Sequence, residues 1–457
     1  MARILRKHKT FFSPEEARVA MDGARNRLMV SIISSRSPFS GAGKRLHDWC
    51  TFARAGWRHA EFQQQTAYCF SPRHFFRRQE KAANVFFLFR DTPSRRNTVQ
   101  RVIAGDNRTF ERGQLFGFAD FLNEGIAVDC NLRLPRTHSL RETLAGLRER
   151  RYVSRVGIGL GDVCSTRAHL WQMNRARVVV ATTDNTGLPA ARLKASGKLR
   201  STLVYISVGL PERLKAVEAN NRARAGRYRK LLSSVDRFIA YGHAEAEWLR
   251  QWLGDDADVR FFPFGVDTER WVPQDVRSAG FDVLSIGADF MRDFDLLVEY
   301  ANSRPEVSIC VVTRRGCLTD HEILPENVQV KYDIETDELK KLISAAKVIA
   351  LPVKENTYSG ATTTLLQCMA MEKPVAVSRV GAIREGYGFS DGENLRWLTP
   401  GSLESMAEVL NELLANPSLC KKIGAEARRH VRENLNWDRF VDNLRECLKE
   451  WLWKKMM

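Results

Sequence analysis

The chain has 457 residues, of which 44% are hydrophobic and 27% are charged, so it is long enough for two or three globular domains. Its nine cysteines include no Cys-x-x-Cys pair, which argues against a disulfide framework or a zinc site and for a reducing compartment. No apolar run approaches the roughly 20 residues that cross a bilayer, and the N-terminal stretch lacks the pattern of a secretory signal. We therefore expect a cytoplasmic protein.

The net charge of +17 is unevenly distributed. Residues 281–457 contain 23 Lys and Arg against 27 Asp and Glu, so the whole positive excess lies in the first 280 residues. A basic lobe favours an anionic partner such as a membrane surface, an acidic saccharide or nucleic acid, although a solvated basic face explains it equally well. Residues 1–84 form a basic extension in which Arg clusters alternate with aromatics, but they contain no RNA-binding signature, which disfavours a nucleic-acid partner.

From residue 85 onward, short apolar runs alternate with helical periods, which is typical of a doubly wound α/β domain. We expect one helix from about residue 109 to 123, because Phe110, Phe118 and Phe121 fall on one side of it. Apolar strands are predicted to open the stretches 85–89, 126–130, 176–187, 202–213, 236–242 and 259–267.

Two features of this first alternation concern ligands. Residues 156–162 are glycine-rich and precede a helix, but they do not match the Gly-x-Gly-x-x-Gly fingerprint, so we exclude a dinucleotide site there. Loops at the carboxyl ends of parallel strands carry ligand groups in open α/β sheets. The resulting candidates are Thr182, Thr183, Asp184, Asn185, Ser207 and Glu212. An ordinary turn explains Asp184, Asn185 and Gly187 equally well.

A second alternation begins after a linker, with apolar strands in 282–290, 307–315, 328–332, 348–351 and 375–377. The chain then ends in amphipathic helices. We predict an α/β protein with two tandem Rossmann-like, doubly wound domains facing a cleft. The predicted boundaries are an extension at 1–84, a first Rossmann-like domain at 85–267, a linker at 268–280, a second Rossmann-like domain at 281–436 and a final helix at 437–457.

The most informative stretch is 347–378, which contains a strand, a loop, a helix opening on three threonines and a second strand. A helix N-terminus leaves backbone N–H groups unpaired and carries partial positive charge, so small residues there give a phosphate access to the amides. An ordinary βα turn with a Ser/Thr cap fits the local pattern as well.

Three segments resemble the glycosyltransferases of the GT-B fold, in particular the large retaining branch that uses nucleotide-activated sugars (glycosyl transferases group 1, family 4-like). Residues 262–273 (FPFGVDTERWVP) look like the end of that branch's first domain, and residues 285–297 look like the first loop of its second. Residues 365–378 (LLQCMAMEKPVAVS) look like its LLEAMACGKPVVAS segment. The resemblance covers about residues 85–450, and Trp437 matches a tryptophan that precedes the family's final, crossing helix.

The resemblance implies a donor site in the second domain. The family's Arg and Lys against the donor diphosphate match Ala288 and Arg292, so one cation remains. Its two glutamates match Ser359 and Gln367; the Gln367 amide can still bind ribose hydroxyls, whereas the sugar side lacks a carboxylate unless the loop folds back to present Glu355. We predict that the donor contacts Gly287, Arg292, Gly360, Thr362, Thr363 and Gln367.

The predicted activity is transfer of a sugar from a nucleotide diphosphate sugar to a saccharide, lipid-linked or other acceptor, in polysaccharide biosynthesis. Arg292 and the helix amides would stabilise the leaving diphosphate, so we expect no metal, and no cofactor beyond the donor substrate. Asp184, and after it Asp162, are the candidate base or orienting groups for the acceptor hydroxyl. The Asp-x-Asp triplets at 256–258 and 293–295 are found in metal-dependent transferases, but their turn and helix-start contexts argue against that role here.

Two other classes stay open from the sequence. One is a nucleotide-sugar-binding protein of the same fold without turnover, and the other is a nucleic-acid-binding protein led by the basic N-terminal region. Sugar-phosphate isomerases of similar architecture are a further enzyme alternative. A transferase that docks on an anionic membrane through its basic lobe would be peripheral at the inner membrane face.

Overall fold

The computed structural model describes residues 83–105, 110–133, 162–276, 280–318, 324–358 and 360–452. Residues 81–457 form one compact unit. The predicted extension up to residue 82, most of the glycine-rich loop (156–161) and Ser359 lie outside the described residues.

The first sheet has six parallel strands in the order β2-β1-β3-β4-β5-β6. Its four inner strands are mostly apolar and almost entirely buried, as parallel sheets covered by helices require. The bounds are β1 Val85–Leu88, β2 Val128–Cys130, β3 Val178–Ala181, β4 Thr202–Ser207, β5 Arg237–Ala240 and β6 Val259–Phe261. The predicted strand at 259–267 therefore ends early, and Pro263, which has no N–H to donate, follows shortly after it.

The helices between these strands follow the predicted alternation, with one correction. The expected helix at 109–123 is two short pieces, because Phe116 and Gly117 adopt left-handed backbone (φ 48° and 86°) and break the helical path. The bounds are α5 Pro93–Ile103, η2 Arg112–Leu115, α6 Phe118–Asn123, α8 Val163–Ala168, α9 Leu170–Met173, α10 Asp184–Ala195, α11 Leu210–Asn220, α12 Arg222–Leu232 and α13 His243–Leu253.

The second sheet also has six parallel strands, in the order β12-β11-β10-β7-β8-β9. The sequence predicted all of them except β12, a short and only half-buried strand with little apolar pattern. The bounds are β7 Val283–Ile286, β8 Ile309–Thr313, β9 Val328–Tyr332, β10 Val348–Leu351, β11 Val375–Ser378 and β12 Arg396–Leu398. Its helices are α14 Phe294–Ser303, α15 Thr336–Ala345, α16 Thr362–Ala370, α17 Leu403–Ala415 and α18 Pro417–Asn434.

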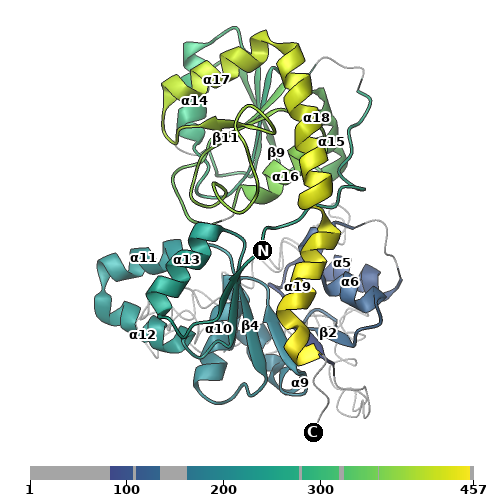
Figure 1. Ribbon diagram of the computed structural model, residues 1–457, viewed down its shortest axis with the longest axis vertical. Helices are drawn as coiled ribbons and strands as arrows, with labels where there is room; N and C mark the ends of the chain where they lie inside the picture. Colours follow the sequence, from purple (N-terminus) through teal and green to yellow (C-terminus); the bar gives the residue numbers. More distant parts are fainter. Residues whose placement is uncertain are drawn as a thin grey trace, which may run out of the picture. The chain divides into compact units, whose positions relative to one another are not determined.

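The last helix, α19 (Trp437–Leu452), follows α18 and packs on the first sheet (Figure 1). Its buried face carries Trp437, Phe440, Leu444 and Leu448, at the helical spacing that the sequence predicts. A parallel bridge between Val266 and Asn436 joins the start of this crossing to the chain that leaves the first sheet.

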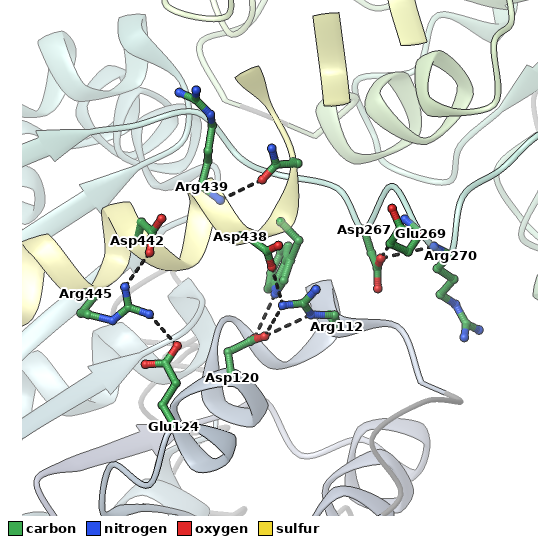
Figure 2. A network of polar contacts seen from close by, with 12 residues as sticks. Arg112, Asp120, Glu124, Asp267, Glu269, Arg270, Asp438, Arg439, Asp442 and Arg445 are labelled. Carbon is green, nitrogen blue, oxygen red and sulfur yellow. Dashed lines mark hydrogen bonds and ion pairs between the residues drawn. The ribbon is translucent and has the colours of Figure 1, made fainter. Parts of the chain in front are cut away.

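Polar contacts fix the N-terminal end of α19 (Figure 2). The Trp437 indole Nε1 donates to Asp120 Oδ2 at 2.9 Å, and Arg112 Nη2 donates to Asp120 Oδ1 at 2.6 Å and Asp438 Oδ1 at 2.8 Å. Further along, Arg445 donates to Glu124 of the first domain and to Asp442 of its own helix. Asp120 is buried, and its carboxylate accepts from both Trp437 and Arg112. Such charge-assisted bonds stabilise the crossing by roughly 1.5–3 kcal/mol each.

Candidate functional site

The strand orders locate the places where ligands are expected. In the second sheet, successive strands run outward from β7 in one direction and from β10 in the other, so the order reverses between these two neighbours. In the first sheet the reversal lies between β1 and β3. Open α/β sheets bind ligands outside the carboxyl ends of the strands at such switch points. The loops after β7 and β10, and those after β1 and β3, are therefore the candidate sites.

The loops after β7 and β10 are joined by backbone contacts. Asp293 N donates to Pro352 O at 3.0 Å, Lys354 N donates to Met291 O at 2.8 Å, and Arg292 and Val353 form an antiparallel bridge. These bonds hold Arg292 beside the carboxyl end of β10 although it follows β7 in the chain.

Arg292 is the central cation of this site. Its side chain is only 3% exposed and lies against Gly287, where an added Cβ would come within 2.0 Å of the Arg292 Nε atom. Nε donates to Asp289 Oδ2 at 2.9 Å, and Nη2 reaches Thr364 Oγ1 at 3.5 Å. Nη1 is buried without a hydrogen-bond partner among the described residues. Burial lowers the pKa of Arg292, but a guanidinium stays charged at neutral pH, so this charged group keeps one buried donor without a partner among the described residues.

The N-terminus of α16 lies beside this cation. Its N-cap residue is Ala361, and no side chain caps it, so the structure corrects the expectation of a Ser/Thr cap. Thr362 is buried, whereas Thr363 is exposed and Gln367, two turns along, is half-buried. The uncapped amides of the first turn and the charge of Arg292 together form an arrangement suited to an anion.

Tyr358 closes one side of the site. Its hydroxyl donates to Asp289 Oδ1 at 2.9 Å, and its ring stacks on Phe290 with centroids 5.7 Å apart. A Cβ at residue 360 would lie 2.3 Å from the Tyr358 hydroxyl, which explains the need for Gly360. Burial and the neighbouring Asp289 raise the pKa of Tyr358, so it remains a neutral donor.

A shallow hollow lies between these loops. It is lined by Asp289, Met291, Val353, Asn356, Tyr358, Gly360, Ala361, Val380, Ala382 and Ile383. Asn356 is buried; its Nδ2 donates to Lys354 O, and its Oδ1 has no partner among the described residues.

The Glu355 carboxylate accepts a hydrogen bond from Gly381 N at 3.0 Å, which ties the loop after β10 to the loop after β11. The carboxylate that lies against the hollow is that of Asp289, which the sequence did not single out. The sequence feature that could have indicated Asp289 is its position three residues before Arg292.

The switch point of the first sheet carries the two predicted acceptor-side residues. Asp162 accepts a hydrogen bond from Asp91 N at 3.0 Å, and its own N–H donates to Asn185 O at 2.7 Å, so the structure brings it next to residue 184. Asp184 is 1% exposed, and its Oδ1 accepts from the Tyr205 hydroxyl at 2.9 Å and Val208 N at 3.3 Å. Burial raises the pKa of Asp184 to about 6. This burial favours an orienting role for Asp184 over direct contact with an acceptor.

Glu245 is a buried carboxyl that sequence reasoning missed. It lies in the first turn of α13, and its Oε1 accepts from Ser207 Oγ at 2.6 Å and Gly209 N at 3.1 Å. Burial raises the pKa of Glu245 to about 8, so it is mainly protonated at neutral pH. An acidic residue in a first helical turn usually reads as dipole stabilisation, so only the structure distinguishes this one.

Within the described residues, no group of three or more His, Cys, Asp or Glu side chains is arranged to hold a metal ion. Asp258 of the first Asp-x-Asp triplet pairs with Arg237 and Arg260. Asp293 caps α14 by accepting from Leu296 N, and Asp295 contacts Lys354. Metal independence stays a prediction.

In the part of the chain that the structure describes, no helix is long and apolar enough to cross a membrane.

Comparison with protein families identifies the second domain. Residues 302–430 match the family model for glycosyl transferases group 1. This part of the chain is therefore similar to the group 1 glycosyltransferases. The predicted resemblance is therefore confirmed for this part of the chain.

A curated relative supports the same assignment of the glycosyltransferase domain. An MMP alpha-(1->4)-mannosyltransferase of Mycolicibacterium hassiacum is 29% identical over 185 residues, which cover 38% of this chain. The match spans 44% of the length of that relative.

Solved structures extend the likeness from the glycosyltransferase domain to the fold as a whole. A sucrose-phosphate synthase from Thermosynechococcus elongatus superposes with a TM-score of 0.60 at 15% identity, covering 80% of this chain and 98% of that one. Anabaena HepE, in complex with UDP and glucose, superposes with a TM-score of 0.57 at 16% identity, covering 80% and 99%. The predicted GT-B fold, with its two parallel α/β sheets, is confirmed.

Proposed function

We propose that the protein is a glycosyltransferase that moves a sugar from a nucleotide diphosphate sugar to an acceptor hydroxyl. The observation that carries the proposal is the unpartnered, buried Nη1 of Arg292 beside the uncapped N-terminus of α16, at the switch point of the second sheet. The group 1 family match and the GT-B neighbours support a transferase rather than a binding protein without turnover or a nucleic-acid-binding protein.

In this proposal the donor diphosphate lies between Gly287 and the first turn of α16. As the bond from the sugar to the diphosphate breaks, negative charge accumulates on the leaving phosphate oxygens. Arg292 and the amides at Thr362 and Thr363 stabilise this charge, because they are already oriented before the reaction and the cation is shielded from water. Gln367 lies further along α16 and is suited to the nucleotide ribose.

The first domain holds the acceptor in this proposal. Asp162 and Asp184 lie at the carboxyl ends of its strands, where they orient polar groups rather than bind the donor. The acceptor class, a saccharide or a lipid-linked saccharide, and a role in polysaccharide biosynthesis are parts of the proposal.

An anionic membrane surface is a further proposed partner of the first domain. Helix α12 carries five Arg and Lys residues and no acidic residue, and Arg222, Arg227 and Lys230 are exposed. Such a helix attracts anionic lipid headgroups. The proposed location is the cytoplasmic face of a membrane, and sedimentation with anionic against zwitterionic vesicles tests it.

The donor site is tested by ligand-induced stabilisation. A nucleotide diphosphate that binds the folded chain raises its unfolding temperature. We expect at least one of UDP, GDP, ADP and dTDP to do so, and its sugar derivative to release the nucleotide in the presence of an acceptor. Arg304→Ala is the control for Arg292→Ala, because Arg304 precedes β8 at the opposite, amino end of the strands. If no nucleotide shifts the transition of the wild-type chain, the proposal fails.

A further inference from the structure

The first domain directly contacts the loop between β10 and α16, which is called the donor loop below. The contact is made by Glu212, in the first turn of α11. One carboxylate oxygen, Oε1, accepts hydrogen bonds from Thr357 N at 3.1 Å and from Thr357 Oγ1 at 2.6 Å. Because both the main chain and the side chain of Thr357 bind the same carboxylate, the contact fixes the position and the orientation of this residue.

Two glycines allow the first domain to approach the loop so closely. A Cβ at residue 242 would come within 2.7 Å of Thr357 O, so only Gly242 fits. Gly209 has left-handed backbone at φ 82° and lies against the Tyr358 ring. A Cβ added at Gly209 would lie 3.4 Å from the nearest atom of that ring. The donor loop is therefore packed against the first domain at two successive residues.

The Glu212 carboxylate is charged at neutral pH. Burial opposes ionisation, but the hydrogen bonds from Thr357 and from Lys215, whose Nζ lies 3.0 Å away, lower the pKa of Glu212 below its usual value. Bonds to a charged acceptor are the stronger kind, which suits a contact that must hold a loop.

From Thr357 the contact continues to the cation. Tyr358 is the next residue, its hydroxyl binds Asp289, and Asp289 binds Arg292. An unbroken series of contacts thus runs from Glu212 in the first domain to the guanidinium in the second.

We infer that Glu212 is a positioning residue: it holds Thr357, and through Tyr358 and Asp289 it sets the place of Arg292 for the reaction. The inference rests on the proposed transferase function. Arg292 and the α16 amides remain able to bind a diphosphate without Glu212, but the loop that aligns them is free to shift. Turnover therefore falls more than nucleotide affinity does.

The test compares Glu212→Ala and Thr357→Val with Thr357→Ser in the full-length chain. We expect the first two variants to lower kcat about tenfold while nucleotide affinity changes by no more than about twofold, since small misplacements act mainly on the reacting geometry. Thr357→Ser keeps the hydroxyl and retains wild-type kcat. The double variant Glu212→Ala/Thr357→Val loses no more than either single variant, because the two residues form one contact.

Glu218→Ala is the matched control on the same helix. Glu218 accepts a hydrogen bond from Trp252 inside the first domain, so this variant reports any general loosening of α11. We expect it to keep kcat. The inference is overturned if Glu218→Ala lowers kcat as much as Glu212→Ala does, or if the losses of Glu212→Ala and Thr357→Val add.

Hydrogen exchange separates this inference from the proposed function. Since the Thr357 amide donates to Glu212, Glu212→Ala should speed its exchange without any substrate present. Unchanged exchange overturns the inference that Glu212 holds Thr357, even if the chain is a transferase. Faster exchange in a chain that binds no nucleotide keeps the contact and rejects the transferase.

Discussion

The carboxyl ends of the two sheets carry opposite chemistry. The end of the second sheet presents a buried cation, uncapped helix amides and a glycine against which the cation lies. The end of the first sheet buries two carboxyls, Asp184 and Glu245, each satisfied at one oxygen by neighbouring donors. One end is therefore suited to an anion, whereas the other holds its carboxyls by hydrogen bonds from neighbouring donors.

The pKa values explain how such ends coexist near one another. Burial raises the pKa of Glu245 to about 8, so this carboxyl of the first sheet is mostly neutral at neutral pH. A neutral carboxyl does not repel the diphosphate, whereas an ionised one in a dry environment would. Substitutions at the carboxyl end of either sheet test this comparison.

The largest expected effect follows from removing the cation. Arg292→Ala takes away the buried guanidinium of the donor site, and removing one preorganised donor to developing charge lowers kcat by about 100-fold or more. The measurement is the kinetics of nucleotide release with acceptor present.

Arg292→Lys separates charge from shape in this experiment. Lys keeps the charge but lacks the planar fork that reaches both Asp289 and the helix, so we expect an intermediate loss of about tenfold. Thermal unfolding of both variants checks the fold, because Arg292 is buried. Normal turnover of Arg292→Ala would remove Arg292 from the mechanism.

The second prediction concerns stability at the acidic end. A carboxyl with a raised pKa binds its proton more tightly in the folded state, so its contribution is complete below the unfolded pKa and is lost as pH rises toward the folded pKa. For Glu245 this window runs from pH 4.5 to about 8. Wild-type stability should therefore fall across it, by at most about 1.4 kcal/mol per pH unit.

Glu245→Gln is the test, since glutamine resembles the neutral acid and still accepts from Ser207 and Gly209. Its stability advantage over the wild type should grow from pH 5 to pH 8 in denaturant titrations. Asp184→Asn is the companion variant, with a window that ends near pH 6. A constant difference between wild type and Glu245→Gln at all pH values would contradict the raised pKa.

The sequence predicted most of this fold because parallel strands buried on both faces read as apolar runs. It missed β12, which is three residues long and half-exposed, and it joined η2 to α6 because the apolar spacing continues through Phe116 and Gly117. Backbone handedness at Phe116 is invisible in a hydrophobic pattern. Periodicity therefore locates elements well and breaks within them poorly.

The residues of the site also divide into those that the sequence predicted and those that it missed. Arg292, Gly360 and the α16 N-terminus follow a motif that is local in sequence, so they could be named in advance. Glu212 was a candidate from its place after a strand, but its bonds to Thr357, like the contacts of Glu245, join segments far apart in the chain, and no local signal marks them. Asp289 lay inside the recognised loop, but its role as partner of both Tyr358 and Arg292 needed coordinates.

A third prediction tests that role of Asp289. Asp289→Asn keeps the size of the side chain but removes the charge that holds Arg292, so we expect kcat/KM to fall about tenfold, equivalent to the loss of one charge-assisted bond. Tyr358→Phe, which loses only the hydroxyl, is the milder comparison. A rise in activity of Asp289→Asn would instead mean that Asp289 holds Arg292 away from the donor.

The smallest expected effect comes from restoring the family's carboxylate on α16. Gln367 is half-buried where related sequences carry a glutamate, and Gln367→Glu converts its bond to a ribose hydroxyl from a neutral into a charge-assisted one. The gain is partly offset by repulsion from the diphosphate, so nucleotide affinity should tighten by only about fivefold, close to 1 kcal/mol. Isothermal titration with the stabilising nucleotide measures this, and Arg304→Ala, at the amino end of the strands, is again the control. A weaker affinity in Gln367→Glu would show that residue 367 faces the diphosphate rather than the ribose. The donor would then lie closer to the N-terminus of α16 than proposed.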